Sequence, residues 1–337
     1  MNELKNSEND IMVSIVCLTY NHELFVEKAI KGFLMQKTNF KYEIIIHDDA
    51  STDGTANIIK KYAEQYPEVF VPILQTENQY SKHVKITPKI AREKARGKYI
   101  ALCEGDDYWI DENKLQKQFD YMEMHPTCSI CGHNSYYLEN QKRDEDNLRD
   151  IVNKTRSNIS FTIEDFLEER NVPITTTASL FIRREVFPNY SWSNRFSFGD
   201  LFFMLSALNS GYFFYFNEPM SIYRINNTNS YNGRMHAEKN SVQKVEKLME
   251  YHFGLIEALE YFNCETSYRW DASIEVAKKY RMFQCLPALY LKKSCLENSG
   301  GFLLCKMFLW MHPSLEQFYL NNSFLKKIKY FFQKLHS

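Results

Sequence analysis

Residues 12–20, MVSIVCLTY, are an apolar and β-branched run that ends in polar side chains, and Asn21 follows it. A run of this length and composition is typical of a buried strand. Apolar residues then recur at helical spacing over 23–35, and a second strand-like run, YEIIIH, follows at residues 42–47. Strands that alternate with helices in this way predict a parallel sheet with helices on its faces.

The alternation continues through the first half of the chain. The sequence predicts helices over 55–66, 88–95 and 114–124 and strands over 69–74, 98–103 and 128–138. Residues 139–158 are charged and show no periodicity, which indicates a surface loop. Further strands are expected near 212–216 and 220–225. From residue 236 onward the patterns are helical, so we expect two domains, residues 1–235 and residues 236–337.

Three of the predicted strands end in polar or acidic side chains. The carboxyl ends of parallel strands meet at one edge of a sheet, where α/β proteins bind their ligands. We therefore expect these strand ends to form a single site. They are Thr19-Tyr20-Asn21, His47-Asp48-Asp49 and Glu104-Gly105-Asp106-Asp107.

The acid cluster of Glu104, Asp106 and Asp107 is the most unusual of these strand ends. Carboxylates this close disfavour the ionisation of one another, and burial strengthens the effect. The cluster is therefore either a solvated turn or the neighbour of a positive group. Carboxylate oxygens are the ligands that Mg²⁺ and Mn²⁺ prefer, and a divalent ion would remove the repulsion. A Gly-Asp-Asp sequence also occurs in polymerase palms. Those enzymes have a different topology, which argues against a polymerase here.

The loop after the second predicted strand combines two kinds of residue. Ser51, Thr52 and Asp53 are natural N-cap residues for the helix that follows. Capping does not need Asp48 and Asp49, which come directly after the strand. An Asp at this place can accept a hydrogen bond from a uracil N–H or a ribose hydroxyl.

Two later positions are candidates for charge recognition. Asp200 begins a predicted helix, where an acid is most often an N-cap or first-turn residue favoured by the helix dipole. Arg224 ends a strand-like run and could pair with a phosphate or with an acid.

The composition argues against several classes of protein. The 41 basic and 42 acidic residues give a net charge of −1, which argues against a general nucleic-acid binder. We interpret Cys128 and Cys131 as buried strand residues, because no second Cys or His pair is present to complete a zinc site.

Neither a signal peptide nor an apolar run long enough to span a bilayer is visible, so we expect a cytoplasmic protein.

The stretch at residues 324–335 is an amphipathic helix by its pattern, with apolar side chains on one face and lysines mostly elsewhere. One interpretation is a helix that lies on an anionic membrane surface, which would suit an enzyme with a lipid-linked acceptor. The other is a helix that packs on its own protein and covers its outer face with lysines.

Taken together, these motifs resemble the family 2 glycosyltransferases. The resemblance covers residues 12–230 and implies the GT-A fold, an α/β architecture with a mixed, mostly parallel sheet flanked by helices. It also implies transfer from nucleotide-diphosphate sugars with inversion. Its motifs, in order, are VSIVxxTYN at 13–21, DDASTDGT at 48–55, GKYIAxxEGDDYW at 97–109, Gly-Asp at 199–200 and Tyr-Arg at 223–224.

Carried over by position, the resemblance gives roles to the acids. Asp49 is similar to the acid that contacts uracil, and Asp200 is similar to the catalytic base. Asp106 and Asp107 resemble the family's D-x-D element, which contacts the ribose and a divalent ion, here Mn²⁺ or Mg²⁺. Glu104 stands where the family often has Asp, so the division of labour among these three acids stays open.

The resemblance also implies residues that border the ligands. Many members have His where this chain has Asn226, which leaves a metal or diphosphate role there open. The nucleotide would be bordered by Thr19, Tyr20 and Asn21, with Glu104 beside them. Candidates for contact with the diphosphate or the acceptor are Arg224, Asn226 and Trp109.

The function that follows is that of an inverting hexosyltransferase of bacterial surface-polysaccharide biosynthesis. It would move a sugar, expected to be UDP-linked, to a hydroxyl group of a glycan or lipid-linked acceptor, in the cytoplasm or at the inner face of the cell membrane. Two other classes stay open. One is a non-catalytic relative that binds nucleotide sugars or glycans, and the other is a nucleotidyltransferase, although no basic triphosphate-binding loop is visible.

Overall fold

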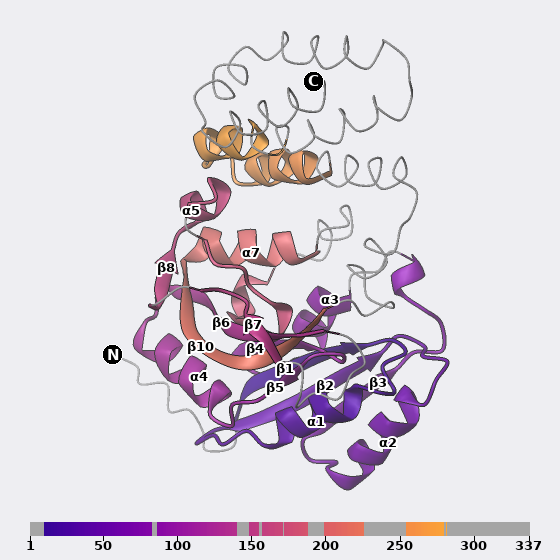
Figure 1. The fold of residues 1–337 in the computed structure, drawn as a ribbon. Helices are drawn as coiled ribbons and strands as arrows, with labels where there is room; N and C mark the ends of the chain where they lie inside the picture. Colours follow the sequence, from indigo (N-terminus) through magenta and orange to yellow (C-terminus); the bar gives the residue numbers. More distant parts are fainter. Residues whose placement is uncertain are drawn as a thin grey trace, which may run out of the picture. The chain divides into compact units, whose positions relative to one another are not determined.

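Ten strands of the described residues form one mixed sheet (Figure 1). The computed structural model describes residues 10–82, 86–139, 148–154, 157–170, 172–187, 199–225, 254–279 and 281, and at positions 139, 148–150, 199 and 200 it describes the backbone alone. The chain divides into two compact units, residues 1–236 and 237–337, and the sheet lies in the first.

The strands lie in the order β3-β2-β1-β4-β9-β6-β10-β5, with β7 beside β6 and β8 beside β10. Their bounds are β1 Ile11–Thr19, β2 Lys41–Asp48, β3 Phe70–Leu74, β4 Tyr99–Glu104, β5 Tyr108–Trp109, β6 Cys128–Glu139, β7 Leu148–Ile151, β8 Ile159–Phe161, β9 Phe181–Arg183 and β10 Tyr212–Ile225. The helices are α1 Val26–Leu34, α2 Thr55–Gln65, η1 Tyr80–Lys82, α3 Ile86–Glu93, α4 Lys114–Met124, α5 Ile163–Leu167, η3 Thr177–Ser179, η4 Arg184–Val186 and α7 Gly199–Ser210.

The first four strands of this order are parallel to one another, as the sequence predicts. Their apolar runs are long because a parallel sheet is covered on both faces, and α1 and α2 lie side by side below these strands in Figure 1. Thr19 of β1 pairs with Asp48 of β2, and Leu18 pairs with Glu104 of β4. The three polar strand ends therefore lie at one edge of the sheet.

The rest of the sheet is mixed. β9 runs antiparallel to both β4 and β6, whereas β10 runs parallel to β6 and antiparallel to β5. The two strands expected over 212–216 and 220–225 are one strand, β10. Its register with β6 shifts between Phe216 and Ser221 around Pro219, because a proline inside a sheet requires a bulge.

A stretch expected to be a loop, residues 139–158, contains a strand. β7 pairs antiparallel with β6 through Tyr136 and Leu138. This strand is not predicted from the sequence because its residues, LRDI, have no apolar alternation.

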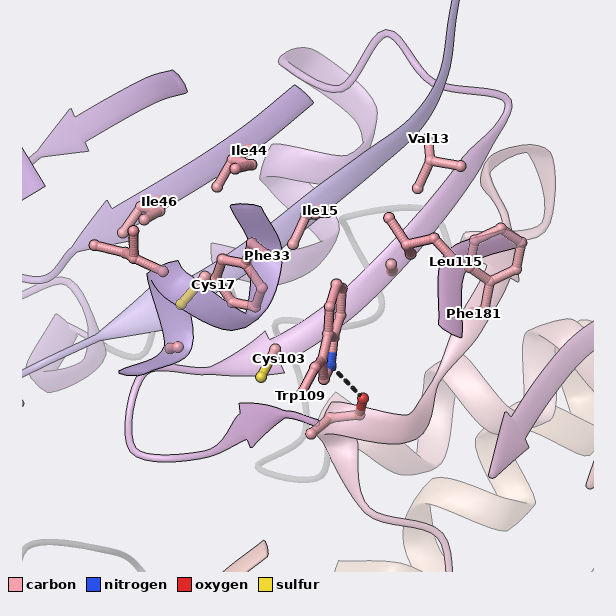
Figure 2. Close-up of a cluster of buried hydrophobic side chains, with 14 of the residues drawn as sticks. Val13, Ile15, Cys17, Phe33, Ile44, Ile46, Cys103, Trp109, Leu115 and Phe181 are labelled. Atoms are coloured by element: carbon pink, nitrogen blue, oxygen red, sulfur yellow. Dashed lines mark hydrogen bonds between the residues drawn. The ribbon is translucent and has the colours of Figure 1, made fainter. Parts of the chain in front are cut away.

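Trp109 lies at the centre of the apolar core between the parallel strands, α1 and α4 (Figure 2). Its indole N–H donates to the carbonyl oxygen of Ala178 at 2.8 Å, and its ring meets that of Phe33 edge-on with 4.9 Å between centroids. Cys128 and Cys131 are buried and free, which confirms their interpretation as strand residues.

In the second unit, residues 254–265 and 271–279 are helical. Within the described part of the chain, no helix is both long enough and apolar enough to cross a membrane. The amphipathic helix expected over 324–335 lies outside the described residues.

Candidate active site at the strand ends

Asp48 joins the ends of β1 and β2. Its Oδ1 accepts a hydrogen bond from Thr19 Oγ1 at 3.0 Å, and its Oδ2 accepts one from the backbone N–H of Ser51 at 3.0 Å. Both Asp48 and Thr19 are buried. The Thr19 hydroxyl, expected at the border of the nucleotide, therefore binds a neighbouring strand end.

Asn21 connects the loops that follow β1 and β2. It adopts a φ of 55°, a left-handed conformation that Asn tolerates better than most residues. Its backbone N–H donates to Ser51 Oγ at 2.9 Å, and its Oδ1 accepts from the backbone N–H of Thr52 at 2.9 Å. Asn21 thus holds the two loops together, and the neighbouring Tyr20 side chain is 43% exposed at this edge.

Asp49 brings a third segment to the same edge. Its backbone N–H donates to the Thr19 carbonyl oxygen, and its Oδ1 and Oδ2 accept the backbone N–H groups of Gln79 and Tyr80 at 2.7 and 3.0 Å. Each carboxylate oxygen has a second lone pair. Asp49 can therefore accept a further hydrogen bond from a ligand, and the side chains of Tyr20 and Tyr80, in the segments to which Asp49 is bonded, are exposed.

The acid turn, residues 104–107, is tied to β1. The backbone N–H of Gly105 donates to the Leu18 carbonyl oxygen at 2.9 Å. A Cβ atom at Gly105 would lie 2.5 Å from Thr19 Cγ2, so only glycine fits this approach. The turn exposes Glu104 but buries the side chains of Asp106 and Asp107.

Asp107 has a buried oxygen without a partner. Its Oδ1 accepts the backbone N–H of Arg224 at 2.8 Å, whereas its Oδ2 has no hydrogen bond. Burial and the neighbouring charges of Asp106 and Glu104 raise the pKa of Asp107 well above its usual value. A buried polar atom without a partner is rare and requires an explanation. A hard cation bound at this oxygen would supply one.

The acids alone do not complete a metal site. No group of three or more His, Cys, Asp or Glu side chains is placed to hold an ion among the residues that the structure describes. Mg²⁺ in proteins is commonly bound by one or two carboxylates, with substrate phosphates and waters as the other ligands. The donor set of Asp106 and Asp107 fits an ion of that kind.

Arg224, at the end of β10, holds the acid turn from the other side. Its Nε donates to the carbonyl oxygen of Asp106 at 3.0 Å, and its guanidinium lies 4.6 Å from the centroid of the Phe25 ring. The side chain is 6% exposed. From the sequence, Arg224 is expected to pair with a phosphate or an acid, and in the structure it binds the backbone carbonyl oxygen of one of the acids, Asp106.

His22 is a residue of this edge that the sequence analysis missed. Its Nε2 lies 4.0 Å from Oδ2 of Asp106. Burial lowers the pKa of His22 below its usual value, so the ring is neutral at neutral pH. A single His forms no motif, and the one available signal was its place directly after the polar end of β1.

Trp109 is a predicted site residue that does not line this edge, and the side chains of Asp200 and Asn226 are outside the described part of the structure. Trp109 lies in the core with 1% of its surface exposed, and its one N–H is used by Ala178, so it does not line the site. Asp200 is the second residue of α7, where the structure describes the backbone alone. Asn226 lies outside the described residues.

Comparison with known proteins gives one matching family. The family model described as glycosyl transferase family 2 matches residues 14–191, more than half of the chain. An uncharacterized protein of Mycobacterium tuberculosis is 48% identical over 121 residues, which are 36% of this chain and 34% of that protein. This chain thus matches about a third of the length of that relative.

Two glycosyltransferases are among the similar sequences. The putative teichuronic acid biosynthesis glycosyltransferase TuaG of Bacillus subtilis is 28% identical over 243 residues, 72% of this chain and 90% of that protein. The UDP-Glc:alpha-D-GlcNAc-diphosphoundecaprenol beta-1,3-glucosyltransferase WfaP of Escherichia coli is 33% identical over 128 residues, 38% of this chain and 47% of that protein.

A solved structure shares the fold. The mannosyltransferase PcManGT of Pyrobaculum calidifontis, in complex with GDP-Man and Mn²⁺, superposes with a TM-score of 0.51 over 92% of this chain and 84% of that one, at 15% identity. The mixed, mostly parallel sheet and this likeness confirm the predicted fold class.

Proposed function

We propose that this chain, which belongs to glycosyl transferase family 2, transfers a hexose from a nucleotide-diphosphate sugar to a hydroxyl group of a glycan or lipid-linked acceptor. The observation that carries the proposal is the buried Asp107 oxygen without a partner, at the edge where β1, β2 and β4 end. Beside Asp106 it offers oxygen ligands to an ion that would in turn bind a diphosphate.

The proposed donor is a UDP-linked sugar. Asp49 keeps lone pairs that a uracil N–H could use, and the exposed side chains of Tyr20 and Tyr80, in the segments bonded to Asp49, could supply surfaces for a base. The relative WfaP is named for UDP-Glc and for a diphosphoundecaprenol acceptor, which supports both a UDP donor and a lipid-linked acceptor here.

In the proposed reaction, a single displacement inverts the anomeric carbon. The acceptor oxygen forms a bond to that carbon while the bond to the diphosphate oxygen breaks, and Asp200 takes the proton of the acceptor hydroxyl. Asp106 and Asp107 would hold Mn²⁺ or Mg²⁺, as the fold relative with Mn²⁺ suggests. When bound, the ion would stabilise the negative charge that develops on the departing diphosphate.

A thermal-shift experiment tests the donor site. UDP with Mn²⁺ is expected to raise the Tm more than either alone, because the ion would bind the acids and the diphosphate together. A ligand at 100 times its Kd adds about 2.7 kcal/mol to the free energy of unfolding, which corresponds to about 4 °C for a chain of this size. Asp107→Asn should lose the part of the shift that depends on Mn²⁺.

The matched control is Asp120→Asn, an exposed acid on α4 bonded to Gln116, which should leave the shift unchanged. UDP-glucose, UDP-N-acetylglucosamine and GDP-mannose in the same assay would identify the donor class. Stabilisation by nucleoside triphosphates alone, with none from any diphosphate or diphosphate sugar, would overturn the proposed function.

We also propose that residues 324–335 bind an anionic membrane surface, because a lipid-linked acceptor is held there. Flotation with vesicles that contain an anionic lipid should carry the full chain to the top of the gradient. A chain truncated before Asn321 should stay at the bottom, and salt should weaken the flotation of the full chain. Equal flotation of the two chains would show that this segment is not the anchor.

A further inference from the structure

We propose that His22 is a positioning residue that orients the carboxylate of Asp106 for the donor and its ion. This inference rests on the proposed function of the acid turn. His22 Nε2 lies 4.0 Å from Asp106 Oδ2, and the Asp106 side chain is buried at the edge of the sheet. Carboxylates in metal and phosphate sites commonly need such a partner to fix their orientation.

The backbone of His22 is fixed firmly enough to serve this purpose. Its N–H donates to Oγ1 of Thr55 at 2.8 Å, in the first turn of α2. Its carbonyl oxygen accepts the N–H groups of Phe25 and Val26 at 2.9 and 2.8 Å, at the start of α1. The ring therefore extends from a point that two helices hold.

The surroundings of the ring select one tautomer. Nδ1 is buried without a hydrogen-bond partner, and a Cβ atom built on Gly105 would lie 2.9 Å from it, so this nitrogen faces the Gly105 backbone. A proton on Nδ1 would be a buried donor without an acceptor, which is unfavourable. In the neutral ring the proton is then on Nε2, the nitrogen that faces the Asp106 carboxylate.

The ring of Phe25 contacts both His22 and Arg224, the two residues that approach Asp106. The Phe25 ring meets the His22 ring edge-on at 6.3 Å between centroids, and it carries the Arg224 guanidinium at 4.6 Å. Arg224 in turn binds the carbonyl oxygen of Asp106. Asp106 is thus approached from two sides, at its carboxylate by His22 and at its backbone by Arg224, and Phe25 packs against both.

The distance of 4.0 Å exceeds that of a hydrogen bond, which for N–H···O is about 2.7–3.2 Å. Hydrogen bonds of active sites are often long without ligand and shorten in the complex. The proposed contact therefore forms by a rotation of the Asp106 carboxylate toward Nε2 when the diphosphate and ion bind. In that position the Nε2–H would hold Oδ2 while the carboxylate faces the ion or the ribose.

Two substitutions separate the role of Nε2 from that of the ring as packing. The amide nitrogen of His22→Gln can reach the place of Nε2, whereas that of His22→Asn reaches only the place of Nδ1. Calorimetry gives the Kd of UDP at a saturating concentration of Mn²⁺ and again with EDTA, and a transfer assay gives the Mn²⁺ concentration for half-maximal rate. His125→Asn, a half-buried His at the end of α4, is the control.

We expect His22→Asn to raise the Mn²⁺ requirement and the Kd of UDP with Mn²⁺ by about 10- to 100-fold. The Kd of UDP with EDTA should not change, and His22→Gln should recover most of the loss. Unchanged values in His22→Asn, or equal losses in both variants with and without Mn²⁺, would overturn the inference. A wild-type chain that binds no UDP and transfers no sugar would instead overturn the proposed function itself, and this inference with it.

Discussion

An Asp200→Asn variant is expected to transfer sugar about 10²–10⁴-fold more slowly than the wild-type chain, the usual contribution of a general base. Asn has nearly the shape of Asp but cannot take the proton of the attacking hydroxyl. Asp200 is the second residue of α7, where loss of its charge gives up a first-turn interaction with the helix dipole of about 0.3–1 kcal/mol, so α7 should still form. The measurement is the rate of UDP release in the presence of acceptor, together with the Kd of UDP, which should not change.

Asp165→Asn is the matched control for this experiment. Asp165 also lies in the first turn of a helix, α5, where its carboxylate accepts the backbone N–H of Thr162 at 3.0 Å. Its substitution should cost some stability and leave the transfer rate unchanged. A full transfer rate in Asp200→Asn would remove Asp200 from the role of base, and a parallel loss of UDP binding would assign it to the donor site instead.

The parallel half of the fold could be predicted because each element has a local signal. Helix α4 has the predicted bounds, and β1, β2 and β4 begin and end within one residue of the predicted strands. Their apolar runs are long and uninterrupted because both faces are buried. Strands that form only because another strand pairs with them were harder to predict. β7 is a strand only because β6 pairs with it, and the two-residue β5 only because of β10.

The position of the site could be predicted from the order of the strands, but the hydrogen-bond partners of its side chains could not. Parallel pairing puts Thr19, Asp48 and Glu104 at one edge, and that could be predicted from the order of the strands. Hydrogen bonds across about thirty positions of sequence decide which atoms are already engaged. Thr19 and Asn21 bind neighbouring loops for this reason, which no pattern in the sequence indicates.

Trp109 was predicted to contact a ligand, but its side chain is buried in the core. Its place at the end of the motif GKYIAxxEGDDYW made it a candidate for contact with the diphosphate or the acceptor. In the structure the strand β5 turns its side chain into the core, where it packs on Phe33 and against the end of Lys114. The direction of a side chain in a two-residue strand depends on its pairing with β10, and the local sequence does not encode that pairing.

Lys114 should make the free energy of unfolding rise with pH between about 7 and 10. Its side chain is fully buried, and burial lowers the pKa of its amine from 10.5 to about 7. Because the folded-state pKa is the lower one, the unfolded chain binds the extra proton throughout this window. Stability is therefore gained as pH rises, by up to about 1.4 kcal/mol per pH unit from this group. Urea unfolding at several pH values, compared with Lys114→Met, isolates the effect.

The difference between wild type and Lys114→Met should grow with pH across the window, because the other groups titrate alike in both chains. Lys117→Met is the matched control on the same helix. The pKa of Lys117 is raised by hydrogen bonds to Glu218 and Asp111, so its removal should leave the slope below pH 10 unchanged. The Lys114 amine also lies 4.0 Å from the centroid of the Trp109 ring and donates to Gln118 Oε1 at 2.7 Å. Both contacts favour the charged form, so equal slopes for wild type and Lys114→Met would show that they outweigh burial and keep the amine protonated inside the core.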